Sequence, residues 1–183
     1  MSSPRIIAGK AGGLRIQSVP GDVTRPITDR VKEALFNILG TDIEDTSFLD
    51  LFGGTGSVGI EALSRGARFT CFIDKNRKAY ETIKANLAHT GLDNNAEVFF
   101  LDAFAYLKKD FNRKFDYIYV APPQYKEIWS KVLLALDAHP TLMAADGWII
   151  VQIDPMEYKQ MEFENFKEFD QRRYGDTLLV FYQ

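Results

Sequence analysis

Three glycines within four residues, Gly53, Gly54 and Gly56, separate a short apolar segment from a segment with the composition of a helix. Residues 48–52 are predicted to form a buried strand, and residues 57–65 the helix that follows it. A strand that turns directly into a helix needs residues that tolerate unusual φ angles and let the backbone approach a ligand. Free N–H groups at the start of such a helix can bind an acceptor or an anion. The turn therefore predicts an α/β fold with a ligand site at this strand end.

Apolar and amphipathic segments alternate along the rest of the chain, and the last two apolar segments flank a turn at residues 174–176. This pattern predicts a seven-stranded, mostly parallel sheet of the Rossmann-like type with helices on both faces. The predicted strands are 48–52, 69–73, 97–101, 115–120, 148–153, 165–172 and 177–182. The predicted helices are 29–39 with Thr28 as its N-cap, 57–65, 76–90, 104–109 and 129–136.

The first 27 residues are predicted to form a small extension of the main domain, which spans residues 28–183. Residues 5–19 alternate loosely around Gly12-Gly13, as a short β-hairpin would, and residues 20–27 have the composition of a linker. Residues 1–40 carry a charge balance of +3, although the whole chain has a net charge of −3. A basic arm of this kind fits a phosphate backbone as partner, or is simply a solvated basic face.

Cys71 is the only cysteine, which excludes a disulfide within one chain and fits a reducing compartment. The two histidines, His89 and His139, lie far apart, so no metal site is expected. No apolar run approaches the length of about 18 residues that crosses a bilayer, and no secretory signal is recognised. We therefore expect a cytoplasmic protein without a membrane partner, and a monomer.

Three aspartates fall at the ends of successive predicted strands: Asp50, Asp74 and Asp102. Asp74 follows Gly54 by 20 residues, where a carboxylate can accept hydrogen bonds from a ribose. Asp102 is placed to accept from an adenine amino group. Residues 54–59 also match the G-x-G-x-x-G pattern of dinucleotide sites, which alone does not separate a nicotinamide cofactor from S-adenosylmethionine. The carboxylates around the turn favour S-adenosylmethionine, which carries a positive sulfonium and no phosphate, over a nicotinamide cofactor.

The loop after the fourth predicted strand contains Pro122 and Pro123, followed by Gln124 and Tyr125. Prolines stiffen the chain and lack N–H donors, but their carbonyls can still accept a hydrogen bond. A carbonyl held in this way can bind the N–H of an exocyclic base amine. Such a base must be flipped out or unpaired, and Tyr125 offers a ring on which it could stack. A plain Pro-Pro turn is the alternative interpretation.

Taken together, these segments resemble the RsmD family of ribosomal RNA methyltransferases. The segments that carry the resemblance are RIIAGK (5–10), TRP (24–26), DRVKEALFN (29–37), DLFGGTG (50–56), GIEALSRGA (59–67) and the Pro122-Pro123 loop. The resemblance implies a class I methyltransferase fold and S-adenosylmethionine as cofactor. It also implies methylation of the N2 amine of a guanine in small-subunit ribosomal RNA, free or in an assembling subunit.

These arguments give a set of expected site residues. Cofactor binding is expected from Asp50, Phe52, Gly53, Gly54, Gly56, Asp74, Asp102 and Ala103, with Thr24, Arg25 and Pro26 at the pocket border. Catalytic roles are expected for Pro122, Pro123, Gln124 and Tyr125. Arg5, Lys10 and Arg15 are expected to bind RNA phosphates, and no residue is expected to bind metal.

The sequence departs from the family pattern at Ala121, where the family has an acidic or amide residue before the two prolines. That residue accepts the second amine proton in the family, and Ala121 cannot. The loss of one such hydrogen bond costs about 1–3 kcal/mol, or about ten- to a hundredfold in rate. A second hypothesis is therefore an RNA-interaction protein that binds the cofactor with weakened catalysis. A third is a nicotinamide-dependent oxidoreductase, which residues 54–59 alone would allow.

Overall fold

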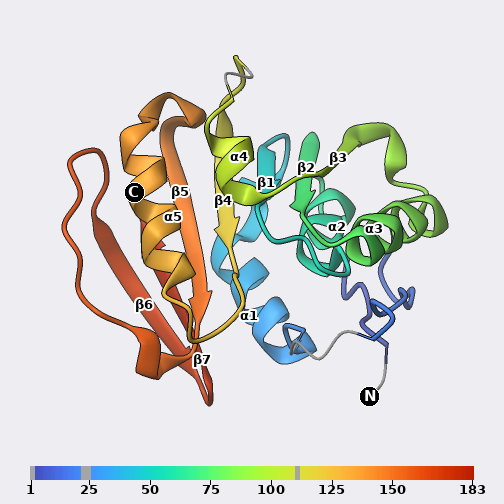
Figure 1. Ribbon diagram of the computed structural model, residues 1–183. Coiled ribbons are helices and arrows are strands. Elements are labelled where there is room, and N and C mark those ends of the chain that lie inside the picture. The colour runs from blue at the N-terminus through green and yellow to red at the C-terminus, as the bar shows by residue number, and fades with distance from the viewer. Residues whose placement is uncertain (1–2, 22–25, 110–111) are drawn as a thin grey trace.

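The computed structural model describes residues 3–21, 26–109 and 112–183, and Figure 1 shows them as one sheet with flanking helices. The strands are β1 (Ser47–Asp50), β2 (Phe69–Asp74), β3 (Ala96–Phe100), β4 (Phe115–Val120), β5 (Met143–Ile153), β6 (Glu168–Tyr174) and β7 (Thr177–Tyr182). The helices are α1 (Asp29–Leu39), α2 (Ser57–Ser64), α3 (Arg77–Thr90), α4 (Ala103–Leu107) and α5 (Ile128–Ala138). Four short 3₁₀ turns are η1 (Gly40–Ile43), η2 (Asp93–Asn95), η3 (Pro140–Leu142) and η4 (Pro155–Glu157).

The seven strands form one sheet in the order β3-β2-β1-β4-β5-β7-β6. Strands β1 to β5 are parallel, whereas β7 runs antiparallel to both β5 and β6. The chain leaves β1 in one direction towards β2 and β3 and later returns to the other side of β1 as β4. This order reversal next to β1 is the place where open α/β sheets bind ligands. The predicted seven-stranded, mostly parallel sheet is thus confirmed.

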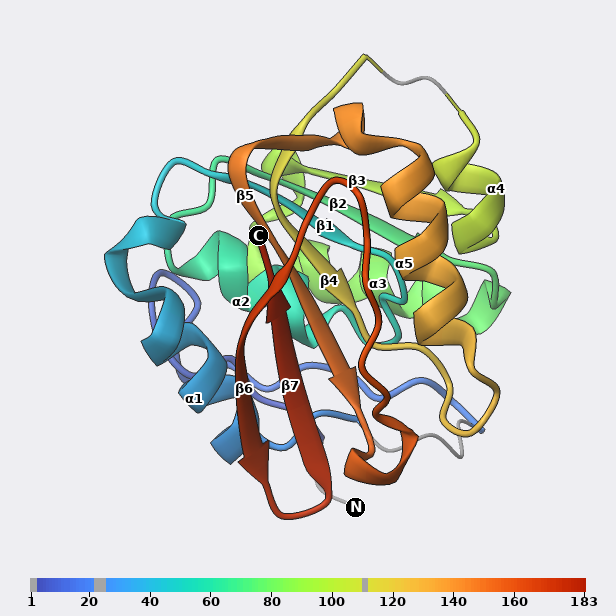
Figure 2. The same ribbon diagram turned by 90° about the vertical axis from the view of Figure 1, so that its left-hand side faces the viewer.

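Two helical layers cover the sheet, as Figure 2 shows for α1 and α2 on one side and α4 and α5 on the other. One core cluster joins α4 and α5 to the sheet through residues such as Trp129, Leu133 and Ile118. On the opposite face, α1 packs through Leu35 and Phe36. A third cluster holds α2, α3 and the N-terminal segment together. No helix among the described residues has the length and hydrophobicity to span a membrane.

Local sequence signals explain most helix ends. The Thr28 hydroxyl caps α1 by accepting from the Val31 amide at 3.3 Å, as predicted. Asn76 caps α3 in the same way, and Gly91 ends that helix with a φ of +72°. Two boundaries differ from the prediction by three residues or more: β5 begins five residues earlier than expected, at Met143, and the edge strand β6 begins three residues later. Register shifts lie at these places, which a simple alternation pattern does not reveal.

The hairpin expected in residues 5–19 is present in a short form: Arg5 and Arg15 make an antiparallel bridge, and the Ile6 amide donates to the carbonyl of Leu14 at 2.8 Å. No strand is present in residues 3–21, which we call the N-terminal arm. Instead, the arm packs on α2 and α3, and its Ile6, Ala11 and Ile16 are no more than 2% exposed. The apolar alternation comes from burial of these side chains against the two helices. The arm backbone bonds both to itself, as from the Gly13 amide to the Ile6 carbonyl at 2.7 Å, and to side chains of α2 and α3.

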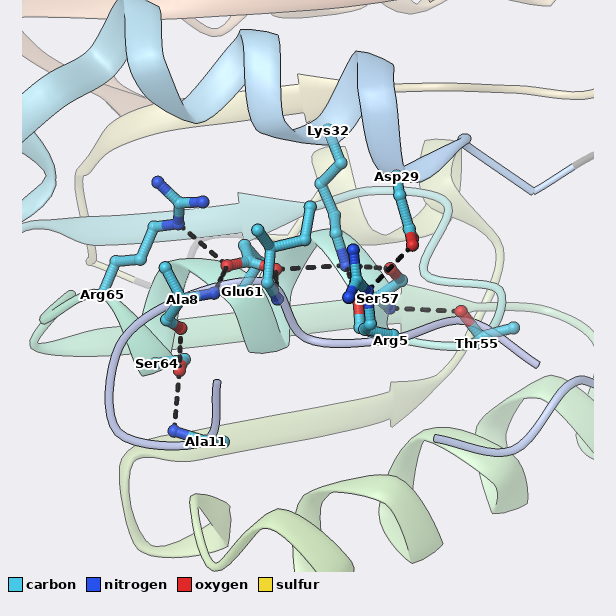
Figure 3. A network of polar contacts seen from close by, with 11 residues as sticks. Arg5, Ala8, Ala11, Asp29, Lys32, Thr55, Ser57, Glu61, Ser64 and Arg65 are labelled. Atoms are coloured by element: carbon cyan, nitrogen blue, oxygen red, sulfur yellow. Dashed lines mark hydrogen bonds and ion pairs between the residues drawn. The ribbon is translucent and has the colours of Figure 1, made fainter. Parts of the chain in front are cut away.

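A buried ionic network fastens the arm, as Figure 3 shows. The Glu61 carboxylate on α2 accepts from the amides of Ile7 at 2.9 Å and Ala8 at 3.1 Å, and it pairs with Lys32 Nζ at 3.1 Å. Lys32 Nζ also donates to the carbonyl of Arg5 at 2.6 Å. Glu61 is completely buried and Lys32 is 1% exposed. The arm is therefore part of the folded core and not a loose appendage.

Candidate functional site

A cavity of about 630 Å³ opens at the carboxyl ends of the parallel strands β1 to β5. This volume lies within the usual range for small-molecule sites. The predicted residues that line it are Pro26, Asp50, Phe52, Gly53, Gly54, Asp74, Asp102, Ala103, Pro122, Pro123 and Gln124. The fold thus brings together residues from four strand ends, as the rule for parallel sheets predicts.

Several predicted site residues lie elsewhere. Gly56 is the N-cap of α2 and does not line the cavity, and neither does Tyr125. Thr24 and Arg25 are outside the described residues. Of the arm residues, Arg5 pairs with Asp29 at 3.1 Å and Arg15 donates to the carbonyl of Ser3 at 3.2 Å, while the Lys10 side chain is exposed.

The glycine turn after β1 is held in place by hydrogen bonds to β2. The amide of Gly53 donates to the carbonyl of Ile73 at 2.9 Å, and the amide of Gly54 donates to Asp74 Oδ2 at 2.9 Å. Gly54 and Gly56 have φ values of +56° and +84°, which residues other than glycine rarely adopt. A Cβ atom at Gly53 would lie 2.6 Å from the Ile83 side chain. The turn therefore needs glycines for both backbone shape and packing.

Asp50 ends β1 at the floor of the cavity and is 1% exposed. Its carboxyl accepts from the backbone amides of Phe52 and Gly59, which ties the glycine turn to the strand. The other oxygen, Oδ1, is buried and has no hydrogen-bond partner within the described residues. A buried polar atom without a partner is costly, so it points to a ligand that would complement it. A cationic ligand group meets that requirement.

Burial raises the pKa of Asp50 to about 7, and the nearby charge of Asp74 adds to the effect. A carboxyl with a raised pKa in the folded state holds its proton more tightly there than in the unfolded chain. Stability therefore falls as the pH rises from about 4 to about 7. We expect Asp50→Asn to remove this part of the pH dependence, so that the variant gains stability relative to the wild type between pH 5 and pH 8. Thermal unfolding across that range measures the difference.

The exposed Asp93→Asn change is the control for this prediction, because it removes an equal charge outside the cavity. Its unfolding temperature should follow that of the wild type across the same pH range. Parallel curves for Asp50→Asn and the wild type would contradict the raised pKa of Asp50.

Asp74 and Asp102 both combine a structural role with a place in the cavity. Asp74 Oδ1 accepts from the amide of Asn76 at 2.8 Å, at the start of α3. Asp102 caps α4, since its Oδ1 accepts from the amides of Phe104 at 2.9 Å and Ala105 at 3.2 Å. Carboxylate oxygens can accept more than one hydrogen bond, so each aspartate can also bind a ligand hydroxyl or amine. Their capping bonds hold them in fixed orientations at the cavity wall.

The loop after β4 leaves the cavity and is fastened to η4. Pro122, Pro123 and Gln124 line the cavity, but the Tyr125 ring is 65% exposed and its hydroxyl donates to Asp154 Oδ2 at 2.7 Å. The Tyr125 amide also donates to Glu157 Oε1 at 2.8 Å, with the residue at a φ of +61°. Tyr125 therefore lies at the rim of the cavity, and its hydroxyl is held by Asp154, which follows β5.

Several polar residues of the cavity wall were not predicted: Thr55, Ser57, Lys75 and Asn76 near the glycine turn, and Tyr119 of β4, Gln152 of β5 and Thr177 of β7. Gln152 could have been found, because it stands one residue before the carboxyl end of the fifth parallel strand and obeys the same rule as Asp50 and Asp74. Thr177 had no such signal, since it begins an antiparallel strand. Within the described residues, no group of three metal-binding side chains is present.

Comparisons with known proteins agree with this geometry. A family model described as "Conserved hypothetical protein 95" matches residues 4–183. The chain is 40% identical over 152 residues to a Bacillus subtilis (strain 168) protein described as "Putative rRNA methyltransferase YlbH", covering 82% of each protein. It is 32% identical over 161 residues to ribosomal RNA small subunit methyltransferase D of Escherichia coli (strain K12), covering 88% of this chain and 76% of the relative. A solved Escherichia coli structure described as "Putative methyltransferase yhhF" superposes with a TM-score of 0.88 at 28% identity, covering 100% and 98% of the two chains.

Proposed function

Because this chain belongs to the family described as conserved hypothetical protein 95, the RsmD family, we propose that it methylates small-subunit ribosomal RNA with S-adenosylmethionine. The proposed acceptor is the exocyclic N2 amine of a guanine. The observation that carries the proposal is the cavity itself, in which a glycine turn, three aspartates and a Pro-Pro loop meet at four strand ends. We further propose that the exposed positive charges of the N-terminal arm contact RNA phosphates.

The described residues fit this cofactor. Asp74 can accept from the ribose hydroxyls, Asp102 from the adenine amine, and the turn Gly53–Gly56 can bind the amino-acid part. The unpartnered Oδ1 of Asp50 matches a ligand with positive charge, while a phosphate would be repelled by Asp50 and Asp74. For this reason, and because the relatives are described as methyltransferases, a nicotinamide cofactor is not favoured.

The bound cofactor would supply a methyl group on a positive sulfonium, which is a good leaving group. The protein's own part is to position the acceptor. The carbonyl of Pro122 would accept one N–H of the amine and so direct the nitrogen lone pair into the cavity. Gln124 would offer a second acceptor in place of the acidic or amide residue of the family, which is Ala121 here. Tyr125 would stack the flipped base at the rim.

Incubation of unmodified small ribosomal subunits and of free small-subunit RNA with labelled methyl donor tests the proposal. We expect stoichiometric transfer to one guanine, located by mass spectrometry of the RNA digest. Binding of S-adenosylhomocysteine without any transfer would instead support the hypothesis of a binding protein with lost catalysis.

The Ala121→Asp variant tests the departure from the family pattern. The new carboxylate would accept the second amine hydrogen, so we expect the rate of methyl transfer to rise by about ten- to a hundredfold, as one hydrogen bond to a charged group allows. Single-turnover rates with saturating cofactor measure the change. An unchanged or lower rate in a variant that still binds S-adenosylhomocysteine would mean that position 121 does not limit the reaction.

A further inference from the structure

A polar pair in the cavity, Tyr119 and Gln152, is separate from the residues proposed to hold the cofactor and the reacting amine. The Tyr119 hydroxyl donates a hydrogen bond to Gln152 Oε1, and both side chains line the cavity together with Ala121 and Pro122. Tyr119 is only 3% exposed, and burial holds the pKa of its phenol well above the ordinary value. The phenol therefore keeps its proton and remains a donor, which fixes the direction of the Gln152 amide.

The pairing of β4 with β5 puts Gln152 beside the Pro-Pro loop. Val120 is paired with Val151, so Ala121 and Gln152 stand at the next step of these two neighbouring strands. Ala121 has a small side chain, and both Ala121 and Gln152 line the cavity. Neighbouring strands lie about 4.8 Å apart, which is comparable to the width of the Watson–Crick edge of a purine. A base whose amine meets the carbonyl of Pro122 would therefore present the far end of that edge to Gln152.

The amide nitrogen of Gln152 makes no hydrogen bond within the described parts of the chain. Because Oε1 accepts from Tyr119, Nε2 is the group with hydrogens left to donate. The far end of the Watson–Crick edge is the O6 acceptor in guanine, whereas the corresponding group in adenine is the N6 amine, a donor. An amide N–H facing this position would pair with guanine and would face a second donor in adenine.

We propose that Gln152, oriented by Tyr119, is a specificity-determining residue that reads O6 of the guanine whose N2 amine is methylated. The inference rests on the proposed function, since it assumes a guanine in the cavity. It assigns to β5 the recognition of the base, while the loop after β4 holds the reacting amine. Sites that hydrogen-bond a substrate atom reject analogues without that atom, because the site's own polar group is then left unpaired.

The test compares two RNA substrates, one with guanine and one with 2-aminopurine at the target position. 2-Aminopurine keeps the amine but lacks O6. We expect the wild type to methylate guanine with a kcat/KM about 10- to 100-fold higher, the effect of one buried hydrogen bond. Gln152→Leu should lose that preference, with the two substrates within about threefold, and should retain its affinity for S-adenosylhomocysteine. Gln160→Leu, an equal change at an exposed position outside the cavity, should behave as the wild type does.

A second variant guards against misfolding of the first. Gln152→Glu can still accept from Tyr119 but replaces the amide donor by an oxygen, which would repel O6. This variant should therefore prefer 2-aminopurine over guanine. Full preference for guanine in either folded Gln152 variant would overturn the inference. If the wild type methylates neither RNA, the proposed function itself fails, and this outcome is distinct from the failure of Gln152 to discriminate.

Discussion

Glu61→Ala should be among the most destabilising substitutions in this protein. The change removes the acceptor of the Ile7 and Ala8 amides and leaves Lys32 as a charge that is 1% exposed. Loss of one partner of a buried ion pair costs about 3–5 kcal/mol. For a domain of this size, with about 2–4 °C per kcal/mol, Tm should fall by about 10 °C. Thermal unfolding followed by circular dichroism measures the effect.

The matched control for this substitution is Glu81→Ala. Glu81 pairs with Arg77 at 3.2 Å with the same i, i+4 spacing that links Glu61 and Arg65, but its side chain is 60% exposed. An exposed pair contributes at most about 1 kcal/mol. Trypsin adds a local measurement, because release of the arm in Glu61→Ala would make the bonds after Lys10 and Arg15 cleavable. Equal Tm shifts in the two variants, with the arm still protected, would contradict the role of Glu61.

Asp74→Ala should lower the affinity for S-adenosylhomocysteine by about 100-fold or more. Asp74 holds the glycine turn through the amide of Gly54 and the start of α3 through the amide of Asn76, and it would also bind the ribose. Hydrogen bonds to a charged group contribute about 1.5–3 kcal/mol each. The loss of the two bonds to the ribose hydroxyls therefore costs at least about 3 kcal/mol of binding free energy. That is about a factor of 100 in Kd. Isothermal titration calorimetry with S-adenosylhomocysteine measures it.

Asp93→Ala serves as the comparison for Asp74→Ala, since Asp93 is exposed, belongs to η2 and does not line the cavity. Its Kd should equal that of the wild type. An intermediate loss is expected for Asp74→Asn, because the amide keeps one acceptor but turns a donor towards one of the two backbone N–H groups. A folded Asp74→Ala variant with wild-type affinity would remove Asp74 from the cofactor site.

The main fold could be predicted from the sequence because its signals are local. Two helices begin at a residue whose side chain caps the backbone, Thr28 for α1 and Asn76 for α3. The same two helices end at glycines, Gly40 and Gly91. Buried parallel strands appear as short apolar runs, which periodicity finds to within a few residues. The beginnings of β5 and β6 were missed because register shifts depend on the neighbouring strand, and no local pattern encodes them.

The short hairpin of the arm was predictable, but its docking on the helices was not, because the contacts that fasten it are non-local. Its amides pair with Glu61, Ser64 and Asn86, which follow their partners by 53 to 69 residues. Every residue of helix α2 is buried, including Ser57, Glu61 and Ser64, which follow one another at the spacing of a single helix face. Buried polar side chains need hydrogen-bond partners, and here the arm and Lys32 supply them.

The candidate site was predictable where a residue type and a strand end coincide, as at Asp50, Asp74 and the Pro-Pro loop. Gln152 is a weaker case of the same coincidence, because it lies one residue before the end of β5 and has an uncharged side chain. The position of Tyr125 could not have been inferred, because it depends on hydrogen bonds to Asp154 and Glu157 across the cavity mouth.

The docking of the arm also sets an order of events during synthesis. Gln17 exchanges hydrogen bonds with Asn86 at 2.8 and 3.0 Å, yet Asn86 is made 69 residues later. At about 5–20 residues per second, the delay is roughly 3–14 s, during which the apolar side chains of the arm stay in water. The arm is therefore secured only after α3 has been made. Until then, the arm should remain open to chaperones and proteases.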